Sequence, residues 1–284
     1  MKDLRLLESE ALTRSGGSLW ALLAGWLSQS PRDQSTFQNF DVVDLSERVP
    51  ITPEVKAHIS DLLRDAKVDP GLLRTAATTL GWPAAEAIFV AASQPSGDAA
   101  RKGVLGEVLD AALLAELFGY QVPVKKHRFK VTPGQPLPSA DILAVRVNNN
   151  TISEVCYVES KLRTARDNMA AVVGYRQLVE CSKRDFPDIA VFVAARLYDH
   201  NDNLLQPFLN YLAGRDDTRN QETYLVGLTW ESSAWAEEVL ANLEGEAENT
   251  ELDVRVHVLK VGQLAQLTSE VFSNIGVDSL SDAD

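Results

Sequence analysis

Two strand-like segments of the chain carry charged side chains whose types and spacing suit metal-dependent phosphodiester chemistry. Asp141 precedes an apolar run in Ala140-Asp141-Ile142-Leu143-Ala144-Val145, and Glu159 and Lys161 lie eighteen residues further on, in Tyr157-Val158-Glu159-Ser160-Lys161. Side chains alternate faces along a strand, so Glu159 and Lys161 project to one side and Ser160 to the other. Charges inside apolar strands are costly unless they are paired or liganded. The pattern therefore predicts a functional site.

Each of these side chains has a defined role in such a site. Asp141 and Glu159 supply the oxygen ligands that Mg²⁺ or Mn²⁺ prefers. The metal would acidify a bound water and neutralise charge on the scissile phosphate. Lys161 would orient that water or stabilise the developing negative charge. Glu107 heads an otherwise apolar stripe of a predicted helix, and it would hold a second metal or a metal-bound water.

Two plainer interpretations stay open at this point. Glu159 and Lys161 are also compatible with a salt bridge at a strand edge, an interaction that is common and only weakly stabilising. Glu107 is compatible with an exposed first-turn acid favoured by the helix dipole. The functional interpretation requires that all four side chains, those of Glu107, Asp141, Glu159 and Lys161, converge on one pocket.

The overall charge bears on possible partners. The chain has 284 residues and a net charge of −13. This balance argues against a freestanding, tight nucleic-acid binder, because phosphate contacts are made mostly by Lys and Arg. Basic residues nevertheless cluster near the candidate site in the sequence. The candidates for DNA contact are Lys125, Lys126, Arg128, Arg163 and Arg166. A solvated strand edge protected by lysines is the alternative interpretation of residues 125–130.

Composition also indicates a compartment. The two cysteines, Cys156 and Cys181, have no metal-ligand spacing and cannot form a disulfide framework, which favours a reducing cytoplasm. The apolar run Leu19–Leu27 is too short to span a bilayer and lacks the basic flank of a signal peptide. No membrane association is expected.

Periodicity and turn signals predict three regions and an α/β fold. We expect a helical N-terminal region over residues 1–95, a core over 96–200 and an α/β C-terminal extension over 201–284. The core is predicted as a long helix, three strands, a helix and a strand, and the fold class as a mixed sheet flanked by helices. These core elements are Ala99–Phe118, Tyr120–Val131, Asp141–Val147, Ile152–Leu162, Asp167–Ser182 and Ile189–Ala195.

The order helix-Glu, strand-Asp, strand-Glu-x-Lys, helix, strand resembles the PD-(D/E)XK nuclease superfamily, the restriction-endonuclease-like fold. The resemblance covers about residues 99–197, and Pro138-Ser139-Ala140-Asp141 departs from a strict Pro-Asp pair. It implies DNA cleavage with Mg²⁺ or Mn²⁺. It also implies that a polar residue on the following helix, Gln177 or Tyr175, completes the site, while nearby arginines contact phosphates.

Two shorter motifs, Gly103-Val104-Leu105-Gly106-Glu107 and Val158-Glu159-Ser160-Lys161, look similar to the nuclease subunit of the Hachiman anti-phage system. This resemblance implies a DNA substrate and a separate helicase (an ATPase) as partner. A partner that makes most of the contacts to DNA would suit the acidic chain. Two other functions stay open: a catalytically silent scaffold that docks through acidic residues 231–253, and a restriction or repair nuclease that acts alone.

Overall fold

A computed structural model describes most of the chain. The described residues are 21–30, 36–91, 94–129, 140–184, 186–214, 222–248 and 252–275. Pro138 and Ser139 of the Asp141 motif lie outside them.

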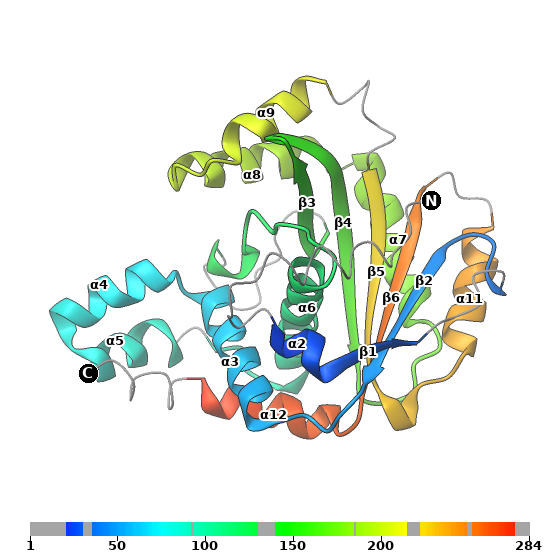
Figure 1. The fold of residues 1–284 in the computed structure, drawn as a ribbon, viewed down its shortest axis with the longest axis horizontal. Helices are drawn as coiled ribbons and strands as arrows, with labels where there is room; N and C mark the ends of the chain where they lie inside the picture. The colour runs from blue at the N-terminus through cyan, green and yellow to red at the C-terminus, as the bar shows by residue number, and fades with distance from the viewer. Residues whose placement is uncertain are drawn as a thin grey trace.

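One six-stranded mixed sheet runs through the protein, with strand order β1-β2-β6-β5-β4-β3 (Figure 1). The strands are β1 Leu27–Ser30, β2 Asp41–Glu47, β3 Ile142–Asn148, β4 Thr151–Arg163, β5 Glu222–Glu231 and β6 Val254–Val261. The four central strands β2, β6, β5 and β4 are parallel, and β1 and β3 are antiparallel at the two edges. Nine of the ten residues of β5 are buried, as expected for a parallel strand covered on both faces.

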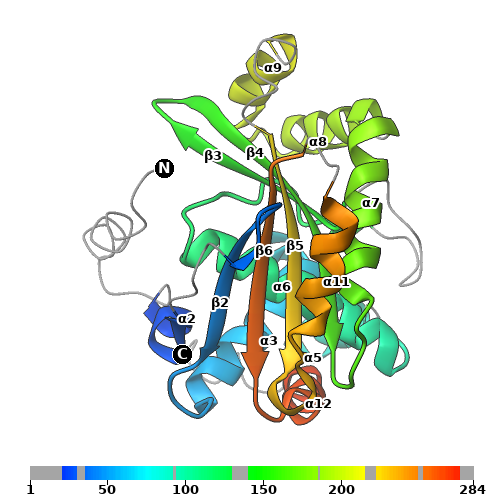
Figure 2. The ribbon, with the colours of Figure 1, turned by 90° about the vertical axis from the view of Figure 1, so that its right-hand side faces the viewer.

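Helices cover both faces of the sheet, which the two perpendicular views show (Figures 1 and 2). On one face α6 packs on β4, together with α2, α3 and α12; on the other, α7 packs on β4 and beside α11. The helices are α2 Ala21–Trp26, α3 Pro53–Lys67, α4 Pro70–Leu80, α5 Trp82–Phe89, α6 Asp98–Glu116, α7 Ala170–Arg184, α8 Phe186–Asp199, α9 Leu205–Ala213, α11 Glu238–Ala247 and α12 Leu264–Asn274.

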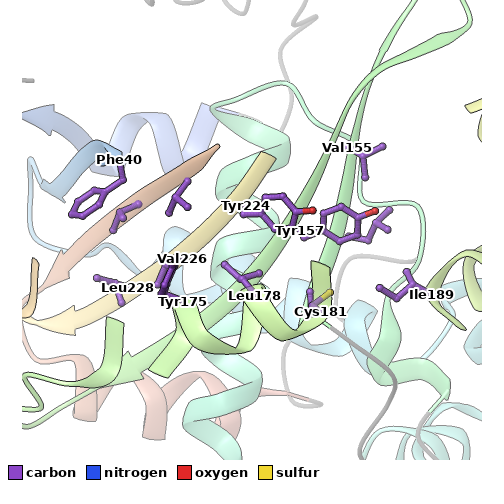
Figure 3. Packing of buried hydrophobic residues seen from close by; sticks show 14 of the residues in the cluster. Phe40, Val155, Tyr157, Tyr175, Leu178, Cys181, Ile189, Tyr224, Val226 and Leu228 are labelled. Atoms are coloured by element: carbon purple, nitrogen blue, oxygen red, sulfur yellow. The ribbon is translucent and has the colours of Figure 1, made fainter. Parts of the chain in front are cut away.

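The core lies in two layers, one on each side of β4. Figure 3 shows part of the layer on the α7 side, where the Tyr157 and Tyr224 rings stack with centroids 5.4 Å apart beside Leu178 and Cys181. On the α6 side, the alternate residues of β4 pack against that helix. This alternation is what sends Glu159 and Ser160 into different layers.

The predicted fold class is confirmed: the protein is α/β, with a mixed sheet flanked by helices. Among the described residues, no helix has both the length and the apolar character needed to cross a membrane.

Two predicted strands of the core are wrong. Residues 189–195 lie within the helix α8, where Ile189, Val193 and Leu197 are buried at helical spacing. A short apolar run does not by itself distinguish a buried strand from a buried helix, and here the helical stripe decides. In the segment Tyr120–Val131, the described residues form one bridge, between Gln121 and Val145, and the 3₁₀ helix η3, Lys126–Phe129.

Candidate functional site

The β3–β4 hairpin places Asp141 and Glu159 face to face. Its two-residue loop, Asn149-Asn150, has positive φ at both positions, the geometry that tight antiparallel hairpins favour. A bulge then shifts the register between Arg146 and Val147, so that Ile142 pairs with Val158. Continued by one residue, this register sets Asp141 opposite Glu159. Without the bulge Asp141 would face Val158, because a one-residue slip exchanges the two faces of a strand.

Backbone and side-chain contacts hold this corner of the sheet together. The Ser160 amide donates to Asp141 Oδ2 at 2.9 Å, and Lys161 Nζ donates to Glu159 Oε2 at 2.9 Å. The Glu159 and Lys161 side chains are only 7% and 11% exposed. Burial and then the adjacent Asp141 carboxylate raise the Glu159 pKa to about 8, although Lys161 opposes this. Two carboxylates and a lysine therefore meet in a largely desolvated corner.

Helix α6 approaches β4 closely enough to add a third acid from the opposite layer. A Cβ on Gly106 would lie 3.0 Å from Ser160 Oγ, so glycine permits this close crossing. One turn later, Asp110 Oδ2 accepts a hydrogen bond from Ser160 Oγ at 2.5 Å. A Cβ on Gly227 of β5 would lie 2.1 Å from that same Asp110 oxygen. Burial above all raises the Asp110 pKa to about 7, and the charges of Asp141 and Glu107 add to the effect.

Glu107 lines a cavity together with Asp141. Its Oε2 is 2.9 Å from His127 Nε2, and the Glu107 side chain is 17% exposed. Lys126 lines the same cavity and donates to the Ala140 carbonyl, next to Asp141. Burial lowers the Lys126 pKa, against the opposing charges of Asp141, Glu107 and Glu159. Glu107 and Asp141 thus line one cavity, whereas Glu159 and Lys161 lie on β4 and are not among its lining residues.

Helix α7, which follows β4, carries the two residues that the superfamily resemblance assigns to the site, Tyr175 and Gln177. Tyr175 is buried among apolar side chains such as Leu178 (Figure 3), and Gln177 is exposed. Gly174 of α7 packs close to Lys161, because a Cβ on this glycine would lie 3.6 Å from the Lys161 Cε atom. The role predicted for Tyr175 or Gln177 stays a prediction.

The predicted DNA-contacting residues fall into two groups. Lys126 is buried, and Arg128 is engaged by the Asp65 carbonyl at 2.8 Å and by Asp69 at 2.9 Å. Lys125 also lies largely inside, and burial lowers its pKa.

Arg163 and Arg166 belong to the second group, which lies nearer the solvent. Arg163 pairs with Asp167 at 2.7 Å, and Arg166 is 61% exposed beside Glu238 at 3.3 Å. Of the five predicted DNA contacts, Arg166 is therefore the most accessible to a large ligand.

Three side chains of the site were not predicted from the sequence. Asp110 carried a signal, since it is an acid inside the apolar run Val108–Leu114 and lies three residues after Glu107 on the same helix. Ser160 lies inside the Glu-x-Lys motif, but only the close crossing of α6 gives its hydroxyl a partner. The contact of His127 with Glu107 depends on the 3₁₀ helix η3, which no periodicity indicates.

The donor set suits a hard divalent cation. Among the described residues, no group of three or more His, Cys, Asp or Glu side chains is arranged to hold a metal ion. Mg²⁺ is commonly held by only one or two carboxylates, with waters completing its shell. Asp141 and Glu159 provide such a pair, and a bound cation would favour the ionised form of Glu159, which burial and Asp141 disfavour by raising its pKa.

Fold and site together define an α/β protein with a buried carboxylate–lysine cluster at the junction of an antiparallel hairpin and a parallel sheet. A family model described as HamA matches residues 41–275, and the chain belongs to that family. This membership indicates a role in Hachiman anti-phage defence. The search of curated proteins gives no match.

Proposed function

We propose that this chain is a DNA nuclease that uses Mg²⁺ or Mn²⁺, with Asp141 and Glu159 as metal ligands, and that it has a restriction-endonuclease-like core. One observation carries the proposal: the bulged hairpin sets Asp141 opposite Glu159, with Lys161 Nζ 2.9 Å from Glu159. Oxygen ligands of this kind suit hard cations. Membership in a defence family supports an activity directed at nucleic acid.

The residues divide the chemistry among them. Bound Mg²⁺ would lower the pKa of a coordinated water and neutralise charge on the scissile phosphate. Lys161 donates to the oxygen that attacks or to the phosphoryl oxygen that gains charge, from a corner where low exposure strengthens its field. The Ser160 amide fixes the orientation of Asp141. Glu107, held by His127, takes a proton or orients a water at the cavity opening.

A separate ATP-driven helicase would complete the function. The net charge of −13, with Lys126 and Arg128 engaged inside the protein, leaves this chain with little basic surface near the site. Affinity for DNA backbone comes mainly from Lys and Arg. A helicase that binds the DNA would supply these backbone contacts and bring the strand to the nuclease. Tight binding of DNA by the isolated chain at physiological salt would count against this division of labour.

A catalytically silent scaffold is the second candidate function. Glu159 is already paired with Lys161 at 2.9 Å, so a metal ion would have to compete with this contact. Under this alternative the acidic stretch 231–253 would serve as a docking surface. The two candidates differ in one observable, the cleavage of DNA.

The test is a cleavage assay on supercoiled and linear DNA, with Mg²⁺ or with chelator, in the presence and absence of the proposed helicase partner. We expect metal-dependent cleavage that Glu159→Gln abolishes. Glu180→Gln on α7 is the matched control, because it makes the same substitution at an exposed position. No cleavage by the wild-type protein, even with its partner, would establish the scaffold function instead.

A further inference from the structure

We propose that the site binds a single divalent cation, because the ammonium group of Lys126 takes the place of a second one. The inference rests on the proposed metal-dependent function and specifies how many metal ions the site accepts. Lys126 belongs to the 3₁₀ helix η3, and only 8% of the residue is exposed. A charge buried to this extent needs compensation inside the protein, and DNA could not provide it without a rearrangement.

The Lys126 side chain lies beside the carboxylates of the candidate site. Its Nζ donates to the carbonyl oxygen of Ala140, the residue before Asp141. It also lines the same cavity as Glu107 and Asp141. Burial lowers the Lys126 pKa, and the charges of Asp141 and then Glu107 oppose this most. The compensation for the buried ammonium therefore comes from the acids to which we assign the metal chemistry.

The groups around the Lys126 ammonium are of the kind that binds a hard cation. Carboxylate and backbone carbonyl oxygens are typical ligands of such ions. An ammonium group has three donors and satisfies the same oxygens through hydrogen bonds and charge. Asp141 connects the two positions, since it faces Glu159 across the hairpin. It also lines the cavity with Glu107 and Lys126. Lys126 thus lies where a second ion would share the Asp141 carboxylate with the first.

The charges of the cluster balance with one divalent ion. Among the described residues, the cluster contains four acids and two lysines: Glu107, Asp110, Asp141 and Glu159, with Lys126 and Lys161. A bound cation favours the ionised form of each acid. Four negative charges then face two positive ones, with His127 neutral, and one Mg²⁺ or Mn²⁺ cancels the difference. A second ion would leave an excess of positive charge in a largely desolvated place, which is costly.

The neighbouring Lys125 provides a contrast within the same segment. It lines the same cavity, and burial lowers its pKa too. The acid that opposes this most is Asp65, near the end of α3, and Asp69, the N-cap of α4, also contributes. The two adjacent lysines therefore interact with different groups of acids. Loss of Lys126, but not of Lys125, should change the metal site.

Titration of Mn²⁺ into the full-length protein, followed by calorimetry and by electron paramagnetic resonance, counts the bound ions without cleavage. We expect one ion per chain in the wild-type protein, with the spectrum of an isolated Mn²⁺. Lys126→Ala should bind two ions, because it removes the competing charge and leaves room for an ion with its waters. Paired ions in such sites lie about 3.5–4 Å apart. At this separation they couple magnetically, so the variant should show the altered spectrum of a coupled pair.

Three further variants separate the charge of Lys126 from its packing. Lys125→Ala is the matched control, because it removes the adjacent lysine, and it should still bind one ion. Lys126→Arg keeps the positive charge and should also bind one ion. Lys126→Gln removes the charge but keeps a polar side chain, so it should bind two ions. The melting temperature in chelator shows which variants fold, and Lys126→Gln replaces Lys126→Ala if the alanine variant does not.

The outcomes separate this inference from the proposed function. Two ions in the wild-type protein, or a single ion in the folded variants that lack the Lys126 charge, would overturn the inference and leave the metal-dependent function intact. A second ion in Lys125→Ala would also overturn it, since the effect would not be specific to Lys126. Absence of Mn²⁺ binding in the wild-type protein would instead contradict the proposed function, and this inference with it.

Discussion

Strand β4 carries two glutamates with little exposed surface, five residues apart, in opposite electrostatic environments: the Glu154 side chain is 13% exposed and the Glu159 side chain 7%. Glu154 accepts hydrogen bonds from Tyr120 at 2.7 Å and Thr223 at 2.8 Å. It also pairs with Arg146 at 3.1 Å and Arg255 at 3.0 Å. Burial opposes its ionisation, but these hydrogen bonds and charges outweigh burial and lower the Glu154 pKa. All the charge on Glu154 is thus compensated within the protein.

Glu159 lies on the same strand with less compensation. It has one lysine partner, and the neighbouring Asp141 carries the same charge, so its pKa rises to about 8. Proteins commonly tolerate such uncompensated charge at functional positions. The comparison shows that burial alone does not distinguish the two ends of β4. The neighbouring side chains distinguish the two ends. Glu154 has two arginines beside it, whereas Glu159 has a second carboxylate beside it, that of Asp141.

The largest expected effect is on catalysis. Lys161→Ala should lower DNA cleavage by about 10²–10³-fold, as for the loss of one preorganised donor to the transition state, while metal binding is retained. Cleavage kinetics at saturating Mg²⁺ measure it. Glu154→Gln serves as the contrasting variant, because it changes the strand without touching the candidate site. A comparable loss of rate in Glu154→Gln would remove the distinction between the two ends.

The second effect concerns the pH dependence of stability through Asp110. Its pKa is raised from 3.8 to about 7, so the folded protein keeps this proton between those values while the unfolded chain releases it. Stability is therefore lost as pH rises from about 4 to about 7, by up to about 4 kcal/mol for this group. Asp110→Asn should remove the loss, making the variant more stable than wild type at pH 8 and equal to it near pH 3.5. Urea unfolding in chelator measures the difference, and parallel pH profiles would contradict it.

The structural glutamate gives the third effect. Glu154→Gln removes the carboxylate that Arg146 and Arg255 share, although Arg255 keeps Asp253 at 3.5 Å, and it should lower the free energy of unfolding by about 1–3 kcal/mol. Denaturant unfolding at pH 7 measures it. Glu180→Gln, at an exposed position of α7, should change stability by no more than about 0.5 kcal/mol. Similar values for the two variants would mean that the Glu154 network contributes little.

A fourth prediction tests the close packing behind the site. Gly227→Ala would place a methyl group 2.1 Å from Asp110 Oδ2, so the carboxylate must move. We expect destabilisation of about 1–3 kcal/mol from overpacking. Gly245→Ala in α11 has no heavy atom within 4 Å of the new Cβ and should instead stabilise by about 0.5–1 kcal/mol. Thermal unfolding of both variants would show opposite signs; equal signs would argue against the tight contact.

The smallest expected effect concerns DNA contact. Arg166 is 61% exposed, so Arg166→Ala should weaken binding about two- to fivefold and reduce the slope of log affinity against log salt by about one, as for one lost phosphate contact. Arg128→Ala is the comparison, because Arg128 is engaged by Asp69. A larger salt effect from Arg128→Ala would reverse the assignment of the two arginines.

Sequence patterns predicted the fold class and the β4 motif because both depend on local alternation. Glu159 and Lys161 share a side of the strand, and Asp141 faces them across the hairpin. The pairing of Asp141 with Glu159 could not be derived, since it depends on a bulge near Val147 that shifts the register by one residue. The long-range sheet order escaped prediction for a similar reason. Strand β2 pairs with β6 more than two hundred residues away, and no local pattern encodes that partner.

The sequence also did not reveal which side chains make contact between a helix and the strand beneath it. Asp110 meets Ser160 only because Gly106 lets α6 approach β4, and Gly227 leaves space on the far side. The burial of Tyr175 is a similar case: it lies on the helix after the motif, and the packing of α7 places it among apolar side chains. Contacts of this kind follow from helix crossings, which residue spacing does not specify.

Calorimetric titration of Mn²⁺ into the purified protein tests the central claim most directly. We expect one or two saturable sites in the wild-type protein and in Glu154→Gln, and affinity lowered by at least about tenfold in Asp141→Asn, as for the loss of a metal-site carboxylate or its support. Absence of Mn²⁺ binding in the wild type, or equal affinity in all three proteins, would contradict a metal site at Asp141 and Glu159.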